Sequence, residues 1–132
     1  MEIFLKASRL FVAAALFCSL GFGNSMAQAP SAADTQQPLT IEITATDYEF
    51  TPSEFTVPPG AKVKVTLLNK GRKDHNIQFD MPDNQKLKLA RDIKAGESMS
   101  LEFTAPGPGT FTFICPVGMH STIGMKGRMI VE

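Results

Sequence analysis

Four side chains with affinity for soft metals lie in the second half of the sequence. Cys115 is followed at five-residue steps by His120 and Met125, in a run whose proline and glycines favour a tight loop. The sequence has 2 histidines, and the other one is His75. Two imidazoles, a thiolate and a weak thioether form the donor set of mononuclear copper sites that transfer electrons. The sequence therefore predicts one copper ion bound by His75, Cys115, His120 and Met125.

Taken singly, each of these residues also fits a purely structural role. A lone histidine is usually an ordinary polar residue, and a buried cysteine usually packs as a small hydrophobe. Met125 also fits as core filler, and we expect Met119 and Met129 to be filler or surface residues. Zinc is an alternative metal, but methionine is a poor zinc ligand. The combination and spacing of the donors favour copper.

The elements that must position these residues are strands. Apolar and polar residues alternate with a two-residue period, which is typical of half-buried strands. No stretch shows a convincing helical period, and the segment 86–94 reads as either strand or irregular. The pattern predicts an all-β sandwich or barrel. The alternating runs are 39–45, 55–57, 63–67, 77–79, 99–103, 111–115 and 129–131, separated by turns rich in proline and glycine.

The predicted strands place the ligands at one end of the sandwich. Cys115 closes the strand 110–114, and His75 opens a strand that runs to Asp80. Because His120 lies in the loop after Cys115, we expect its ring to be nearer solvent than that of His75. Uncharged neighbours are expected to form an exposed apolar patch around the His120 ring, or else to pack over the metal. These neighbours are Pro116, Val117, Gly118, Met119 and Ile123.

The first 27 residues read as a secretory signal peptide. Lys6 and Arg9 precede an apolar run that is too short to span a bilayer, and small residues precede a cleavage site after Ala27. The bulky Phe17 before Cys18 argues against lipid attachment, so no membrane anchor is expected after cleavage. Residues 28–38 are polar and bounded by proline, as in a flexible linker, and 39–132 form the domain. The sequence predicts a periplasmic protein.

Composition excludes several classes of function. The chain has 13 Lys+Arg and 13 Asp+Glu, so no excess of positive charge points to nucleic acid or to an anionic membrane. After cleavage, Cys115 is the one cysteine left, which permits no internal disulfide. A lone thiol in an oxidising compartment needs protection by burial or by a metal. About a hundred residues bury a sufficient core without disulfides.

Three stretches of the sequence resemble the cupredoxin family of blue copper proteins. They are 47–60, 68–76 and 109–131, and the resemblance covers 39–132. It implies a Greek-key β-sandwich with the copper ligands named above. It also implies that Asn76 fixes the ligand loop through hydrogen bonds around the Cys115 sulfur. The interval between Cys115 and His120 is longer than in some members, and the sequence assigns no subfamily.

Several functions are compatible with such a site. The first hypothesis is a monomeric one-electron carrier that meets redox partner proteins transiently near His120. Copper delivery is the alternative, because the thioethers of Met119 and Met129 suit transfer of Cu(I) to a partner. The stretch 47–60 is also similar to cupredoxin-like modules of iron-uptake systems. An enzyme is not expected, since 2 histidines are too few for multicopper oxidases or copper nitrite reductases.

Overall fold

The structure, a computed structural model, describes residues 37–132. The predicted signal peptide and the linker up to residue 36 lie outside these residues. The described part contains 9 β-strands and a single 3₁₀ turn, η1, at Pro82–Asn84. The strands are β1 Leu39–Thr46, β2 Glu49–Thr51, β3 Glu54–Val57, β4 Lys62–Asn69, β5 Gln78–Asp80, β6 Lys86–Lys88, β7 Ser98–Thr104, β8 Gly109–Ile114 and β9 Lys126–Val131.

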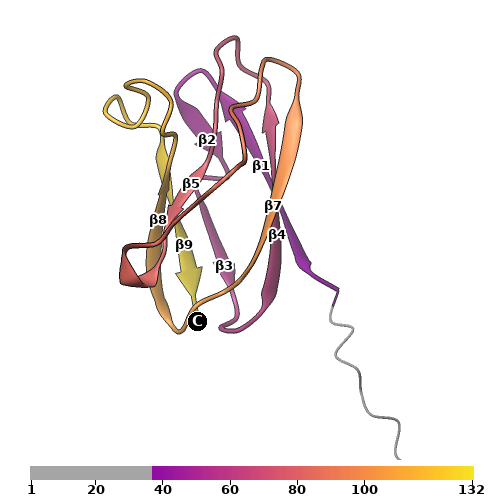
Figure 1. Ribbon diagram of the computed structural model, residues 1–132, viewed down its shortest axis with the longest axis vertical. Helices are drawn as coiled ribbons and strands as arrows, with labels where there is room; N and C mark the ends of the chain where they lie inside the picture. The colour runs from indigo at the N-terminus through magenta and orange to yellow at the C-terminus, as the bar shows by residue number, and fades with distance from the viewer. Residues whose placement is uncertain (1–36) are drawn as a thin grey trace, which may run out of the picture. The chain divides into compact units, whose positions relative to one another are not determined.

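The strands form two sheets that face each other as a sandwich (Figure 1). One sheet has the order β2-β1-β4-β7, and the other has the order β3-β9-β8-β5-β6. Within these sheets β1 pairs with β4, and β3 with β9, in parallel, while the remaining pairs are antiparallel. The predicted all-β sandwich is confirmed. The parallel pairs join strands that are distant in sequence, which the alternation pattern alone does not reveal.

The core between the sheets follows from the alternation of apolar residues. In β4, Val63, Val65 and Leu67 are fully buried, while the residues between them are partly or fully exposed. Phenylalanine rings fill the middle of the sandwich. Phe113 lies 5.2 Å from Phe79 and 5.5 Å from Phe50 between ring centroids, at angles typical of aromatic packing. The sandwich therefore has a continuous apolar core between its two sheets.

Two segments differ in detail from the sequence prediction. His75 does not open a continuous strand: it forms an isolated bridge with Ile93, and β5 begins at Gln78. The cause is local, because the side-chain oxygen of Asn76 accepts the backbone N–H of Ile77 at 2.8 Å, in place of a ladder partner. The ambiguous segment 86–94 is both strand and irregular, with β6 at its start.

The loop between β8 and β9 lies at the end of the sandwich opposite the C-terminus (Figure 1). The turn between β1 and β2 lies at the same end. The loops that follow β4 and precede β7 reach that end as well. No helix in residues 37–132 has the length and apolar character of a membrane span. All the predicted ligands belong to this one end of the domain.

The core predicts that the metal-free protein is folded. Joining His75 to Cys115 closes a loop of about forty residues, at a cost of roughly 3 kcal/mol. Burial of the apolar side chains at about 25 cal/mol per Å² outweighs this cost without help from a metal. Circular dichroism of the chelator-treated protein should give a β-sheet spectrum and a cooperative thermal transition. A random-coil spectrum would instead indicate folding driven by the metal.

Candidate metal centre

The loop between β8 and β9 brings three of the predicted ligands to its base. The backbone N–H of Cys115 donates to the carbonyl of Met125 at 3.1 Å, and the N–H of Met125 donates to the carbonyl of His120 at 3.0 Å. Gly118 and Gly124 have φ values of 51° and 113°, which glycine adopts at little cost. These hydrogen bonds and turns fold the loop back on itself, so that residues ten positions apart meet beside the end of β8.

His75 reaches the same place from the segment between β4 and β5. Its backbone N–H donates to the carbonyl of Ile93 at 3.0 Å, and its backbone carbonyl accepts the N–H of Ile93 at 2.8 Å. The His75 side chain is fully buried. The imidazole is therefore fixed by its own backbone and by the surrounding core.

Asn69 shapes the loop that leads to His75. This buried side chain donates to the carbonyl of Lys73 at 2.7 Å and to that of Ile93 at 3.0 Å. Its oxygen accepts the N–H of Gly71 at 2.9 Å. The Asn69 amide thus satisfies backbone groups on both sides of the bridge between His75 and Ile93, and it holds the turn after β4 in place.

Three predicted ligand atoms converge in the structure. The Cys115 Sγ lies 3.5 Å from Nδ1 of His120 and 3.8 Å from Nδ1 of His75. All three atoms lie within 4.8 Å of one another. Metal–ligand bonds of about 2.0–2.3 Å, arranged trigonally, separate their donor atoms by roughly 3.5–4.0 Å. The spacing of these atoms matches a trigonal site with one thiolate and two imidazoles.

The surroundings set the charges of these ligands. Burial lowers the pKa of His75, and the neighbouring His120 lowers it further, so its imidazole is neutral and able to bind a metal. Burial raises the pKa of the Cys115 thiol above its ordinary value of 9.0. Hydrogen bonds from the backbone N–H groups of Asn76 and Val117 oppose that rise. These N–H groups stabilise the thiolate form, which is the form that binds metals.

Asn76 acts on both sides of the site. Its backbone N–H faces the Cys115 sulfur, as noted above, while its side chain is directed elsewhere. The amide nitrogen donates to Oδ1 of Asp92 at 2.8 Å, and the amide oxygen accepts the N–H of Ile77. The side chain therefore ties the segment around His75 to the segment that carries Ile93.

The methionines separate into distinct environments. Met125 is fully buried, and its backbone hydrogen bonds place it beside Cys115 and His120. Met129 is also fully buried, in β9, and belongs to the core. Met119 is 69% exposed at the tip of the ligand loop. The sequence prediction of filler or surface roles for Met119 and Met129 agrees with these positions.

The turn between β1 and β2 contacts both histidines, which the spacing of residues did not predict. Oδ1 of Asp47 lies 4.0 Å from Nε2 of His75. The ring of Tyr48 packs edge-on against His120, with a centroid distance of 5.1 Å and an interplanar angle of 82°. Tyr48 has a φ of 74°, which is unusual for a bulky residue. Tyr48 is the only tyrosine in the sequence, but no pattern connects it with His120.

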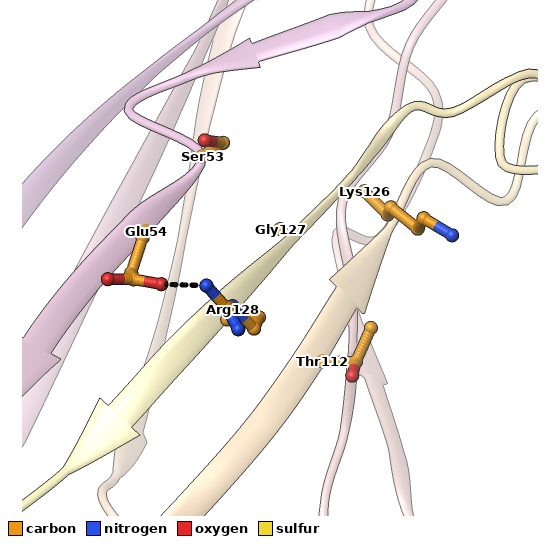
Figure 2. Close-up of a pocket in the computed structure, with 6 residues that line it drawn as sticks. All are labelled: Ser53, Glu54, Thr112, Lys126, Gly127 and Arg128. Atoms are coloured by element: carbon orange, nitrogen blue, oxygen red, sulfur yellow. Dashed lines mark ion pairs between the residues drawn. The ribbon is translucent and has the colours of Figure 1, made fainter.

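A separate hollow on the outer face of the five-stranded sheet contains none of the candidate ligands (Figure 2). Two of its charged residues are paired, since Arg128 contacts Glu54 at 2.6 Å. Gly127 is required there, because a Cβ would collide with the Phe113 ring and with the carbonyl of Ser53. The hollow is lined by Ser53, Glu54, Thr112, Lys126, Gly127 and Arg128.

Comparison with known proteins identifies the family of this chain. Residues 10–131 match the family model of a cupredoxin-like domain. The chain therefore belongs to the cupredoxin-like family. The assignment confirms the predicted fold, copper as the cofactor, and a protein that is not an enzyme. The donor set agrees with copper on chemical grounds, since the buried Cys115 sulfur lies close to an imidazole nitrogen of His75 and of His120.

Individual relatives are similar over most of the described domain. Plastocyanin of Dryopteris crassirhizoma is 31% identical over 96 residues, which cover 65% of this chain and 90% of the relative. Reduced auracyanin from the photosynthetic bacterium Roseiflexus castenholzii has a TM-score of 0.62 at 28% identity, covering 73% of this chain and 98% of that one. Auracyanin A of Chloroflexus aurantiacus has a TM-score of 0.63 and covers 73% of this chain and 100% of that one. At 23% identity it shows the fold alone.

The convergence on Cys115 predicts an intense colour for the Cu(II)-loaded protein. A short thiolate bond to copper produces strong visible absorption, so Cys115→Ser should abolish the colour even where some copper still binds. Optical and electron-spin-resonance spectra provide the measurement, and circular dichroism controls for the fold of the variant. A colourless wild-type Cu(II) complex with ordinary tetragonal spectra would contradict this geometry.

Proposed function

We propose that this chain is a periplasmic one-electron carrier in which His75, Cys115, His120 and Met125 hold a single copper ion. The observation that carries the proposal is the convergence of the Cys115 sulfur and the two Nδ1 atoms at 3.5 and 3.8 Å. Copper supplies a Cu(I)/Cu(II) couple at such a donor set. The colour test on Cys115→Ser described above tests the metal centre itself.

The fixed positions of the ligands support electron transfer. His75 is held by two backbone hydrogen bonds, and Cys115 is held at the base of a hydrogen-bonded loop. Both side chains are fully buried. Ligands that move little between two oxidation states keep the energy of reorganisation low. The residues around the site therefore provide rigidity and exclude water.

The exposed surface near His120 supports a place for partner docking. His120 is partly exposed, whereas His75 is fully buried. Met119 and Ile123 on the same loop are 69% and 55% exposed, and Tyr48 beside the His120 ring is 41% exposed. Exposed apolar side chains gathered in one place usually mark interaction sites. We propose that this patch meets redox partner proteins in small, short-lived contacts.

Copper delivery remains a second candidate function because of Met119. Its thioether is exposed on the ligand loop, where it suits a transient contact with Cu(I). Met129 does not support this role, since it is buried in the core. The full burial of His75 and Cys115 favours a resident ion over an exchanging one. The proposed export to the periplasm rests on the N-terminal sequence pattern of Lys6, Arg9 and the apolar run that follows. A monomeric state is part of the same proposal.

Met125 is expected to tune the copper site without creating it. Axial thioether bonds are long and weak, so Met125→Gln should keep copper and lower the reduction potential, whereas Met125→Leu should raise it. Spectroelectrochemistry measures the potential, and metal analysis measures the copper content. Loss of copper in either variant would make Met125 a primary ligand and would overturn the trigonal assignment.

The apolar patch predicts a charge-sensitive rate of electron self-exchange. Met119→Lys places a positive charge where two copies must approach, which should slow exchange on the order of tenfold. NMR line broadening in mixtures of reduced and oxidised protein measures the rate. Thr56→Lys is the matched control, because it adds the same charge at an exposed position on β3, outside the patch.

In the Met119→Lys variant, the copper spectrum should stay unchanged. An unchanged exchange rate would mean that electrons leave through another surface. An equal slowing in Thr56→Lys would mean that net charge, and not the patch, controls the rate.

A further inference from the structure

The outward-facing nitrogen of His75 lacks a hydrogen-bond partner. Nδ1 of this ring faces the Cys115 sulfur, and Nε2 points away from it. Among residues 37–132, Nε2 of His75 is the only buried side-chain nitrogen or oxygen without a hydrogen bond. Native proteins rarely leave such a group unpartnered, because its desolvation is costly. A partner for this nitrogen is therefore expected in the functional state.

Asp47 is the acidic residue that faces this nitrogen. Its Oδ1 lies 4.0 Å from Nε2, which is longer than a hydrogen bond but close enough for a charge to act on a ring N–H. The backbone N–H of Arg72 donates to this oxygen at 2.8 Å, and the Arg72 side chain contacts Oδ2 at 3.3 Å. The Arg72 backbone hydrogen bond is the main cause of the lowered pKa of Asp47, which keeps the carboxylate ionised at neutral pH.

Gly71 allows the carboxylate and the ring to approach each other. A Cβ at this position would lie 2.7 Å from Oδ1 of Asp47 and 2.9 Å from Nε2 of His75. Both separations are shorter than side chains tolerate. Glycine is needed here for space between the two groups, which ties the loop after β4 to the contact.

We propose that Asp47 is a positioning residue for His75 whose carboxylate faces the Nε2–H and favours Cu(II) over Cu(I). The inference rests on the proposed role of His75 as a ligand through Nδ1. When Nδ1 binds the metal, the ring proton lies on Nε2 and points to the side where Asp47 stands. A carboxylate opposite a ligand imidazole fixes its tautomer and makes it a stronger donor, which stabilises the more positive oxidation state.

The main test is Asp47→Asn, which keeps the shape of the side chain and removes its charge. We expect Cu(II) affinity to fall about tenfold, within the usual range for loss of such a partner, while Cu(I) affinity changes little. A tenfold change in that ratio raises the reduction potential by about 59 mV. Competition titrations of both oxidation states and spectroelectrochemistry give the values. An unchanged ratio of the two affinities would overturn the proposal.

A second variant approaches the same contact from the other side. Gly71→Ala inserts a methyl group between the two groups and should raise the potential in the same direction as Asp47→Asn. It leaves the Asp47 charge in place, so agreement between the two variants would support a local contact. A fall in potential in Gly71→Ala would count against it.

Asp74→Asn is the matched control for charge. Asp74 precedes His75 in the sequence, is half exposed, and pairs with Lys94 at 3.5 Å. It carries the same charge near the same ring but is not the group that faces Nε2. We expect less than about a threefold change in the Cu(II)/Cu(I) affinity ratio, because solvent screens exposed charges. A change as large as that of Asp47→Asn would mean that any nearby negative charge shifts the affinity ratio, and it would overturn the proposal.

A measurement on the metal-free protein provides an independent readout. Nitrogen-15 NMR of the His75 ring should find the Nε2–H tautomer in the wild type and less of it in Asp47→Asn. A predominant Nδ1–H tautomer in the wild type would contradict the proposed role of Asp47. The proposed function has a separate test: a blue Cu(II) form in all variants would sustain it whatever the result at Asp47, and a colourless wild type would defeat it.

Discussion

The pair of backbone hydrogen bonds between His75 and Ile93 is the contact on which the metal centre depends. These residues belong to segments that are otherwise irregular, and the bridge is the point where they join the sandwich. The Ile93 carbonyl also accepts the Asn69 side chain, so the turn after β4 is fixed by the same atom. Because the histidine is set by backbone and core, the Cys115 loop closes onto an imidazole that is already in position.

The two histidines differ in their exposure to solvent. His75 is fully buried, whereas His120 is partly exposed in the loop between β8 and β9. The turn after β1 touches both rings, through the Asp47 carboxylate on one side and the Tyr48 ring on the other. The interior ring is thus adjusted by charge, and the outer ring is bordered by apolar surface. One short turn therefore lies beside both candidate histidine ligands.

The sequence predicted the strands and singled out the candidate ligands because both depend on local information. Burial on one face of a sandwich imposes alternation, as in β4, and the ligand types are rare enough to stand out. The start of β5 was misplaced because the Asn76 side chain competes with the ladder for the Ile77 N–H. The contacts of Asp47 and Tyr48 were missed because they join residues far apart in sequence. Only the parallel pairing of β1 with β4, and the turns beyond it, brings those residues to the histidines.

The left-handed backbone at Tyr48 lowers the stability of the fold, but it places the Tyr48 ring against His120. A bulky residue with a φ of 74° raises the free energy of the folded state by about 1–3 kcal/mol relative to a relaxed turn. Glycine would remove that strain, but it would also remove the ring that packs on His120. A search for thermostable variants of this protein would therefore select a change at position 48 that uncovers one of its two histidines. Stability alone is a poor guide to improving this domain.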